Sequence, residues 1–474
     1  MDKIDPSVVF KSLMRKLDDP NPDERLSAIA TLGVMFKSSS HSDYDTLSMI
    51  DDAVQKLRQI IKKDPSDNVR IAAIGAFGEM NYRDSVPILI NSLKDPTPNI
   101  CAAAAKALGL IGDPTSVHFL LDAALSAYDQ NPSLPNALAR FKDPKIAKNI
   151  VDALLKGVES PETAVAKNAI NALIVINDPR ALPALIKASK KPNQEIRELS
   201  IYSLSNFRNE QLLPVLLPAL SDSSSAVKIA AIYVIAGVEG NMFSFSNLHY
   251  DPIPNLPKDV ISSIISLSKD PDPEVRACSA AALGKIGDTS AESPLIAALN
   301  DPERNVRLNA TYALGNLGSS KATKNLIKIM NDPSEDVRVA GIFVLAQLKE
   351  KTAIPDLIGA LKDSNSNVRF AAISTLGIFL DVSSIPPLLE SLKDKESYLR
   401  EAAIDALRKF TEQKIPIDKK SYAAIRKFTE SFHFEKLKSD PETRQAHADI
   451  SNVLSDLASQ SKPEMRQGNL KSKL

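Results

Sequence analysis

The sequence contains no tryptophan, and aromatic residues make up only 5% of its 474 residues. Large globular cores depend on aromatic side chains, whereas closely packed helices depend on Ala, Leu, Ile and Val, which are abundant here. The chain is also longer than the size at which a single hydrophobic core usually stops growing. We therefore expect either several domains or a repeat array.

The chain lacks a net charge, because 58 basic residues balance 58 acidic ones. A protein that mainly holds nucleic acid should carry a basic excess, so nucleic acid is not an expected partner. The only two cysteines, Cys101 and Cys278, lie within helical patterns, and we expect free thiols in a reducing compartment. The first residues show no secretory signal pattern, and no apolar run is long enough for a membrane span. These observations predict a cytoplasmic protein.

A turn that begins with Asp recurs every 31 residues. The run Asp-Pro-Asp-Pro-Glu-Val-Arg at 270–276 returns in the same frame at Asp301, Asp332, Asp363 and Asp394. Further upstream, related turns occur near residues 19, 64, 95, 160, 191 and 222. Chance does not hold such a register over five consecutive units, so the sequence predicts a repeat architecture.

Each unit contains the signals for two helices. The turn Asp is placed to cap a helix, and the Pro after it suits a first helical turn. An Ala-rich segment follows and stops at Gly287-Asp288, which is typical of a helix C-terminus. A second apolar segment then leads to the next turn. The fold class that we predict is all-α, an α-solenoid of about 12 two-helix repeats.

The motif Asp-Pro-x-x-x-Val-Arg-x-x-Ala-Ala-x-Ala-Leu-Gly-x-Ile-Gly-Asp is nearly complete at 270–288. This pattern resembles the armadillo-like helical HEAT family, most closely its PBS-lyase HEAT-like repeats, over roughly residues 5–411. In such proteins the turn Asp and the helix Arg form a ladder between adjacent repeats. The resemblance therefore implies structural roles for Asp270, Arg276, Asp301, Arg307, Asp332, Arg338, Asp363, Arg369, Asp394 and Arg400.

The predicted array spans residues 1–411 and is interrupted at three places. An irregular repeat at about 126–157 contains Pro132 and Pro135, which shorten its second helix. We expect the loosest packing there, in a repeat that is either a hinge or merely degenerate. Insertions are expected at about 38–46 and 239–257. The second insertion either folds back on the array or meets a partner through Met242, Phe243, Phe245 and Tyr250.

The repeat pattern is lost after the array. Residues 412–459 still show helical patterns, and we expect them to cap the open end, as a solenoid requires. The polar stretch 460–474 is expected to be a disordered tail.

One face of the second helices, meaning the helices that directly follow each turn Asp, is a candidate binding surface. Counted from the turn Asp as zero, positions 5, 9, 12, 13 and 16 are apolar or small and form the core face. Positions 4, 7, 11 and 15 lie on the opposite side, which lines the concave groove in HEAT-like arrays. Either these side chains bind a protein partner, or they pack between adjacent second helices. The stripe that we select comprises Tyr202, Tyr233, Leu308, Tyr312, Val339, Phe343 and Phe370, and we expect a polar rim at positions 4 and 15.

The sequence shows no pattern typical of catalysis. The five histidines share no metal-ligand spacing with one another or with a cysteine. We expect no catalytic residue, no metal, no cofactor and no small-molecule ligand. The leading prediction is a non-enzymatic scaffold or adaptor that binds one or more proteins. The repeat subtype implies an alternative, a lyase or isomerase subunit that attaches bilins to phycobiliproteins, and a nucleic-acid-binding HEAT-like protein is the third.

Overall fold

The computed structural model describes residues 6–37, 44–126, 131–207, 209–237, 251–431 and 441–460. The four selected residues of the second insertion, from Met242 to Tyr250, lie outside this part of the chain, as do residues 461–474 of the predicted tail. The first insertion is described only from Tyr44, where a helix begins. Two compact units make up the chain, unit 1 (Met1–Ala219) and unit 2 (Leu220–Leu474).

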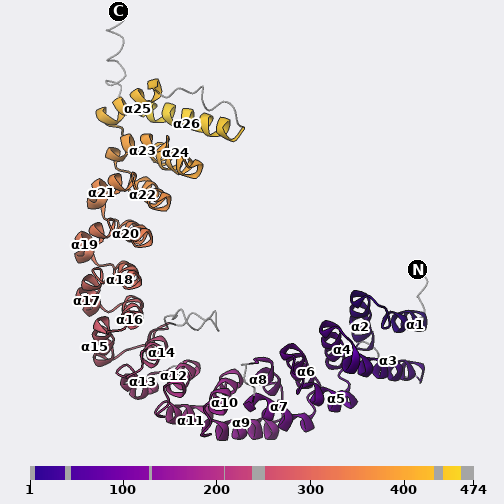
Figure 1. Cartoon of the computed structure of the whole chain (residues 1–474). Coiled ribbons are helices and arrows are strands. Elements are labelled where there is room, and N and C mark those ends of the chain that lie inside the picture. Colours follow the sequence, from indigo (N-terminus) through magenta and orange to yellow (C-terminus); the bar gives the residue numbers. More distant parts are fainter. Residues whose placement is uncertain are drawn as a thin grey trace, which may run out of the picture. The chain divides into compact units, whose positions relative to one another are not determined.

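The described part of unit 1 contains thirteen α-helices, drawn in indigo to magenta in Figure 1. Their bounds are α1 (Pro6–Lys16), α2 (Pro22–Lys37), α3 (Tyr44–Lys63), α4 (Asp67–Glu79), α5 (Val86–Ser92), α6 (Pro98–Ile111), α7 (Val117–Ser126), α8 (Ser133–Leu138), α9 (Pro144–Val158), α10 (Thr163–Ile176), α11 (Ala181–Ala188), α12 (Gln194–Ser203) and α13 (Leu213–Ala219).

Another thirteen α-helices belong to the described part of unit 2. They are α14 (Ser225–Ala236), α15 (Lys258–Ser266), α16 (Pro273–Ile286), α17 (Glu292–Ala298), α18 (Arg304–Asn316), α19 (Thr323–Ile329), α20 (Glu335–Gln347), α21 (Ile354–Ala360), α22 (Ser366–Phe379), α23 (Ile385–Ser391), α24 (Ser397–Glu412), α25 (Lys419–Ser431) and α26 (Pro441–Ser459). Helices α1 to α24 form twelve consecutive pairs along the chain, which confirms the predicted all-α repeat fold.

The helix ends follow from the repeat motif, with one correction. Gly287 ends α16 with a φ of 78°, and its N–H donates to the carbonyl of Leu283, as expected for a left-handed C-terminal cap. The turn Asp is not the N-terminal cap, however. Asp270 accepts the N–H of Asp272 at 3.0 Å, and Asp272 in turn caps α16. The reason is that the turn takes up two residues before the helix begins, so the first Asp closes an Asx turn instead.

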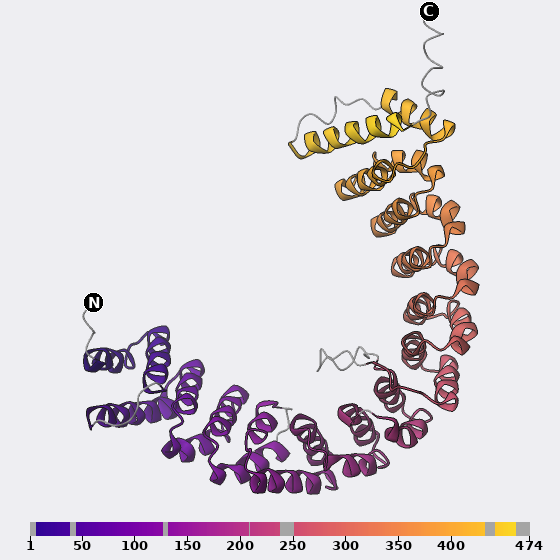
Figure 2. The ribbon, with the colours of Figure 1, turned by 180° about the vertical axis from the view of Figure 1, so that it is seen from behind.

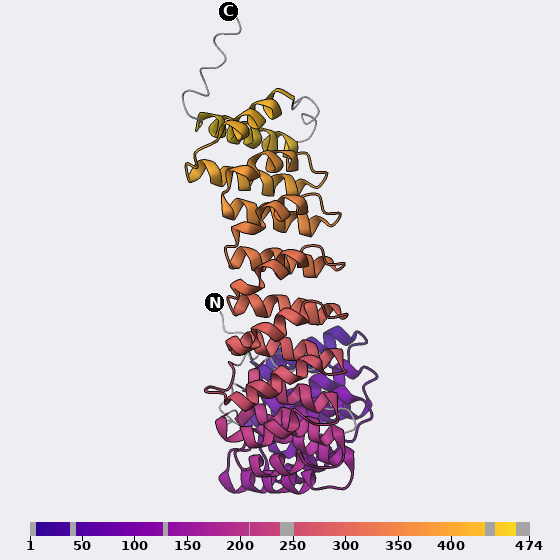
Figure 3. The same ribbon diagram turned by 90° about the vertical axis from the view of Figure 1, so that its left-hand side faces the viewer.

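The helices of unit 2 form two layers. The even-numbered helices α16, α18, α20, α22 and α24 pack on one another, and the odd-numbered helices α17, α19, α21 and α23 each pack on the even-numbered helix that follows (Figure 1). Figure 2 shows both layers from behind, and Figure 3 shows the orange helices of this unit lying across the stack. The core lies between the layers, because positions 5, 9, 12 and 13 of α16 to α24 are buried.

Adjacent even-numbered helices approach closely where position 14 is glycine. A Cβ atom added at Gly284 would lie 2.5 Å from the Cα of Ala313, which is nearer than real Cβ contacts come. The same addition at Gly377 would lie 2.8 Å from the Cβ of Ala406. Glycine therefore allows backbones of neighbouring repeats to pack at a distance that no other residue permits.

The irregular repeat is well packed at its second helix, contrary to our expectation. Helix α8 has six residues, and Leu134, Ala137 and Leu138 are each 1% exposed. A Cβ at Gly109 of α6 would lie 2.8 Å from the Cα of Ala137, so these helices are in close contact. The expected penalty is avoided because Pro135 lies in the first turn of α8, where its missing N–H has no intrahelical partner.

Segments outside the regular repeats also pack on unit 2. Ile253, in the described part of the second insertion, is 3% exposed, and its N–H donates to the carbonyl of Ile235 at 2.8 Å. At the C-terminal end, α25 packs on α23 and α26 packs on α24. The hydroxyl of Ser421 donates to the carbonyl of Val382 at 2.9 Å, and the side chain of Gln460 donates to the carbonyl of Thr411 at 2.8 Å.

Candidate protein-binding surface

Large apolar side chains are exposed at eight described positions, and five of them lie on one face of unit 2. These five belong to four consecutive even-numbered helices, α18, α20, α22 and α24, and occupy positions 4, 7, 11 and 15. The other three, Val8, Val34 and Val175, are dispersed over α1, α2 and α10 of unit 1. We call the five the apolar stripe: Tyr312, Phe343, Phe370, Ile378 and Tyr398.

The apolar stripe continues from one repeat to the next. Tyr312 and Phe343 both hold position 11 in successive repeats and are 46% and 45% exposed. Helix axes in contact lie about 10 Å apart, so these rings are neighbours on the surface. The rings of Phe370 and Tyr398, on α22 and α24, have centroids 6.1 Å apart. Single exposed apolar residues are normal, but a series on the same face of adjacent helices marks a surface suited to binding.

Not every residue selected from the sequence lies in the apolar stripe. Tyr233 is only 6% exposed, so its selection as a surface residue was wrong. Helix α14 is enclosed over its last turns, since every residue from 230 to 237 is buried and Ile253 binds its end. Leu308 and Val339 of unit 2 are half-buried, and so is Tyr202 of unit 1.

Two members of the apolar stripe were missed by the sequence argument. Ile378 is 57% exposed at position 15 and Tyr398 is 39% exposed at position 4. Both positions were assigned to a polar rim, because the preceding repeats carry Asn, Asp, Glu, Gln or Lys there. The available signal was the change of residue type itself, from polar to large and apolar at a position already known to face outward.

Fixed polar groups surround the apolar stripe. The side-chain amide of Asn309 donates to the carbonyl of Ala277 at 3.0 Å, and that of Gln347 donates to the carbonyl of Gly315 at 3.1 Å. Each bond joins the side chain of one even-numbered helix to the backbone of its neighbour. These bonds help to fix the spacing between the helices that carry the exposed rings. Positions 7, 11 and 15 of α18, α20 and α22 carry no charged residue. The middle of the surface is therefore uncharged, as the centre of a protein interface usually is.

A ladder of arginines and aspartates ties the repeats of unit 2 together. Arg307 donates from Nη1 to the carbonyls of Asp301 and Pro302 in its own turn, at 2.9 Å each. Its Nε and Nη2 donate to the two carboxylate oxygens of Asp332 in the next turn, at 2.7 and 2.9 Å. The same arrangement joins the pairs Arg276–Asp301, Arg338–Asp363 and Arg369–Asp394.

The ladder alters the acidity of its carboxyl groups. Burial alone would raise the pKa of Asp301, but hydrogen bonds from Arg276 and from the N–H of Glu303, with the charges of Arg276 and Arg307, outweigh burial and lower it. The pKa of Asp394 is lowered in the same way, with burial opposed mainly by Arg369. These carboxyl groups are held ionised and act as structural ties.

The cysteines are free thiols held in their protonated form. Burial raises the pKa of Cys278 to about 11, with a smaller contribution from the charge of Glu274. Burial also raises the pKa of Cys101. A thiol becomes a nucleophile only as the thiolate, so neither group is activated. Among the described residues, no cluster of three or more His, Cys, Asp or Glu side chains could hold a metal ion.

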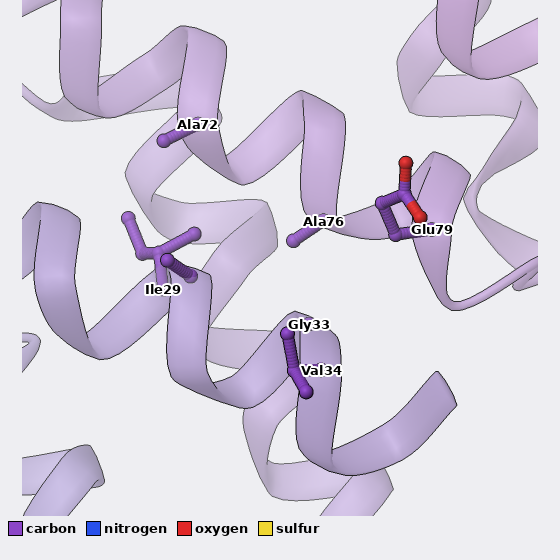
Figure 4. Close-up of a pocket in the computed structure, with 7 residues that line it drawn as sticks. Ile29, Gly33, Val34, Ala72, Ala76 and Glu79 are labelled. Atoms are coloured by element: carbon purple, nitrogen blue, oxygen red, sulfur yellow. The ribbon is translucent and has the colours of Figure 1, made fainter. Parts of the chain in front are cut away.

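Unit 1 carries a groove on the corresponding face. The groove lies between α2 and α4 and has a volume of about 340 Å³ (Figure 4). Its wall is apolar apart from one carboxylate at the rim, and is formed by Ile29, Ala30, Gly33, Val34, Ala72, Ala76 and Glu79. No helix in the described part of the chain has the length and apolar character needed to cross a membrane.

Family models match the repeats over more than half of the chain. The model for HEAT repeats matches residues 54–131, 136–205, 151–236, 261–340 and 323–408. The chain belongs to the HEAT-repeat family. No curated protein matches its sequence.

Solved karyopherin structures share the fold of this HEAT-repeat chain. A complex of Kap95 with Nup1 has a TM-score of 0.60 at 14% identity and covers 96% of this chain and 68% of its own. The structure of Kap95p with RanGDP has a TM-score of 0.59 at 14% identity, and the match covers 96% of this chain and 67% of that one. Kap121p bound to the extreme C-terminus of the phosphatase Cdc14p has a TM-score of 0.54 at 14% identity, and the match covers 98% of this chain and 59% of that one. At this identity the likeness concerns the fold alone, and the chain spans about two thirds or less of these proteins.

Proposed function

We propose that this HEAT-repeat chain is a non-enzymatic scaffold or adaptor that binds protein partners through the apolar stripe of unit 2. The observation that carries the proposal is the exposure of five large apolar side chains on the same face of four adjacent helices. Aromatic side chains at an uncharged centre, with polar groups around them, provide most of the binding energy in protein interfaces.

The fold supports the same proposal. A layer of parallel helices held by the arginine ladder gives a rigid surface, so little conformational entropy is lost when a partner binds. The karyopherins of similar fold are seen bound to proteins, namely RanGDP, Nup1 and Cdc14p. We propose protein partners for this chain by analogy with that use of the fold, and a cytoplasmic location remains a prediction from the sequence.

Affinity capture from the source cells tests the proposal. The test variant combines Tyr312→Ser, Phe343→Ser and Phe370→Ser, which removes three exposed rings. The matched control combines Val8→Ser, Val34→Ser and Val175→Ser, three exposed apolar side chains of unit 1. We expect a partner to be lost from the first variant and kept by the second, while the helicity and melting temperature of both stay at the wild-type values. Retention of every partner by a folded test variant would exclude the apolar stripe as the binding surface.

The two alternatives from the sequence remain open to direct tests. A bilin lyase or isomerase subunit, which the PBS-lyase HEAT-like resemblance implies, should transfer phycocyanobilin to an apo-phycobiliprotein and develop its absorbance. A nucleic-acid-binding protein should bind a short duplex with an affinity that falls steeply with salt. No observed feature of the described residues favours either alternative over the scaffold.

A further inference from the structure

The arginine ladder of unit 2 ends at Arg400 in the described part of the chain. Arg400 holds the same repeat position as Arg276, Arg307, Arg338 and Arg369. Its Nη1 donates to the carbonyls of Asp394 and Lys395, at 2.8 and 3.1 Å. Within the part of the chain that the structure describes, its Nε and Nη2 make no hydrogen bond.

The preceding arginines show what this pair of donors binds. In all four, Nε donates to one carboxylate oxygen of the next turn Asp at 2.7–2.8 Å, and Nη2 donates to the other at 2.9–3.1 Å. Two parallel bonds of this kind give the strongest and most specific recognition of a carboxylate by arginine. Because Nη1 of Arg400 is fixed by the same two carbonyls, its free donors are already oriented for such a ligand.

Two acidic groups of the turn before α24 have other partners. The carboxylate of Asp394 binds Arg369 at 2.8 Å, and the Glu396 carboxylate lies 3.9 Å from the ammonium of Lys395. Arg400 is half-buried, so its charge is partly withdrawn from water and favours a nearby anion.

We propose that Arg400 binds an Asp or Glu side chain of the protein partner, an inference that rests on the proposed function of the apolar stripe. The two features adjoin. One repeat earlier, Arg369 directly precedes Phe370, whose ring contacts Tyr398 of the helix that carries Arg400. A partner that covers these rings therefore reaches Arg400 at the end of the stripe. The ligand is an acidic residue beside apolar side chains, held by the same two bonds that join the repeats.

A direct test uses the full chain and a carboxylate taken from its own ladder. The probe is the acetylated, amidated pentapeptide of residues 361–365, whose Asp363 binds Arg338 within the chain; the control peptide carries Asp363→Asn. Nε–Hε resonances of ¹⁵N-arginine report each guanidinium, and they are assigned with Arg369→Lys and Arg400→Lys. Lysine keeps the charge but lacks the parallel donors.

We expect the Asp peptide to shift the Arg400 resonance while those of Arg276, Arg307 and Arg369 stay in place, and the Asn peptide to shift none. Absence of a shift at Arg400 in the otherwise native chain would overturn the proposal. A shift that appears only after Glu435→Gln and Asp440→Asn would also overturn it, because the carboxylate would then come from the chain itself. These two acids lie outside the described residues.

The partner found by affinity capture separates this inference from the proposed function. Arg400→Lys should weaken its binding about tenfold, which corresponds to about 1.4 kcal/mol. The control Arg426→Lys changes an exposed arginine of α25 that pairs with Glu430 and should leave binding unchanged. If the triple variant of the apolar stripe loses the partner but Arg400→Lys binds as well as wild type, the function stands and the carboxylate site is wrong.

Discussion

The helices α16 to α24 of unit 2 and the helices α2 to α4 of unit 1 share one repeat motif but pack differently. At position 14, a Cβ on Gly284 would lie 2.5 Å from the backbone of Ala313, whereas a Cβ on Gly33 would lie 3.7 Å from the Cβ of Ala76. Between the turns, α3 of unit 1 has 20 residues and α17 of unit 2 has seven. We attribute the wider spacing of α2 and α4 to the longer connecting helix, since the facing residues are Gly and Ala in both cases.

The difference in spacing produces two kinds of surface. The wide contact leaves a groove of about 340 Å³ lined mostly by small apolar residues (Figure 4). The narrow contacts close the backbone layer, so that large side chains such as Tyr312 and Phe343 must project from it. A repeat protein can therefore present either a groove or a ridge on the same face, depending on the length of the helix between two turns.

Loss of a ladder arginine should have the largest effect on stability, and the effect should depend on whether the arginine holds the next carboxylate through two bonds or one. Arg307→Gln leaves the carboxylate of Asp332, whose side chain is 5% exposed, without its partner. Breaking a buried ion pair in this way costs about 3 kcal/mol of unfolding free energy. Arg25 of unit 1 holds Asp64 through the same two bonds, at 2.9 and 3.0 Å, and Arg25→Gln should cost as much. Between α4 and α6, Arg70 makes one bond of 3.2 Å to Asp95, whose side chain is 21% exposed, so Arg70→Gln should cost about 1 kcal/mol.

Urea unfolding followed by circular dichroism measures these free energies. The surface control is Arg304→Gln, since Arg304 and its partner Asp336 are about half exposed and such a pair contributes at most about 1 kcal/mol. Equal losses for Arg307→Gln and Arg304→Gln would show that the ladder does not stabilise unit 2.

Glycine substitutions should give an opposite sign in the two regions. Gly284→Ala places a methyl group against Ala313, and because the obstacle is backbone it should destabilise unit 2 by about 2 kcal/mol. Gly33→Ala meets only ordinary van der Waals contact and should stabilise α2 by about 0.5 kcal/mol, since alanine favours the helix. Thermal unfolding of both variants is the measurement. A stabilised Gly284→Ala protein would mean that α16 and α18 are farther apart than described.

Most of the fold could be predicted from the sequence because the repeat makes each element visible many times. The 31-residue period and the core positions follow from it, whereas a ladder that includes Arg276 and Arg307 was implied only by the family resemblance. The candidate surface was predicted less well. Tyr233 follows the same pattern as Tyr312, yet it is buried in a helix whose end binds Ile253, a contact made by an insertion outside the period. Periodicity reports the face of a residue, but not what covers that face.

The smallest expected effect is on the pH dependence of stability. It distinguishes two causes of a lowered carboxyl pKa. In unit 2 the pKa of Asp301 is lowered because the hydrogen bonds and charges around it, chiefly those of Arg276, outweigh burial. In unit 1 that of Asp113 is lowered chiefly by the hydroxyl and backbone of Thr115. A carboxyl group with a lowered folded pKa binds protons less readily than in the unfolded chain, whose pKa is about 3.9. Its contribution to stability is therefore complete above about pH 5 and is lost as pH falls through the folded pKa.

Stability measured from pH 6 to pH 2.5 should accordingly fall less steeply for Asp301→Asn and for Asp113→Asn than for the wild type. The carboxyl groups of Asp301 and Asp113 differ in how their neighbours lower the pKa. Arg276→Gln should raise the pKa of Asp301, because it removes both the charge and two hydrogen bonds, and Thr115→Val should raise the pKa of Asp113 through its hydroxyl alone. Carboxyl ¹³C titration of each variant resolves the two sites. An unchanged pKa of Asp301 in Arg276→Gln would mean that its ionisation is maintained by Arg307 and the backbone, and that the ladder is electrostatically redundant at this repeat.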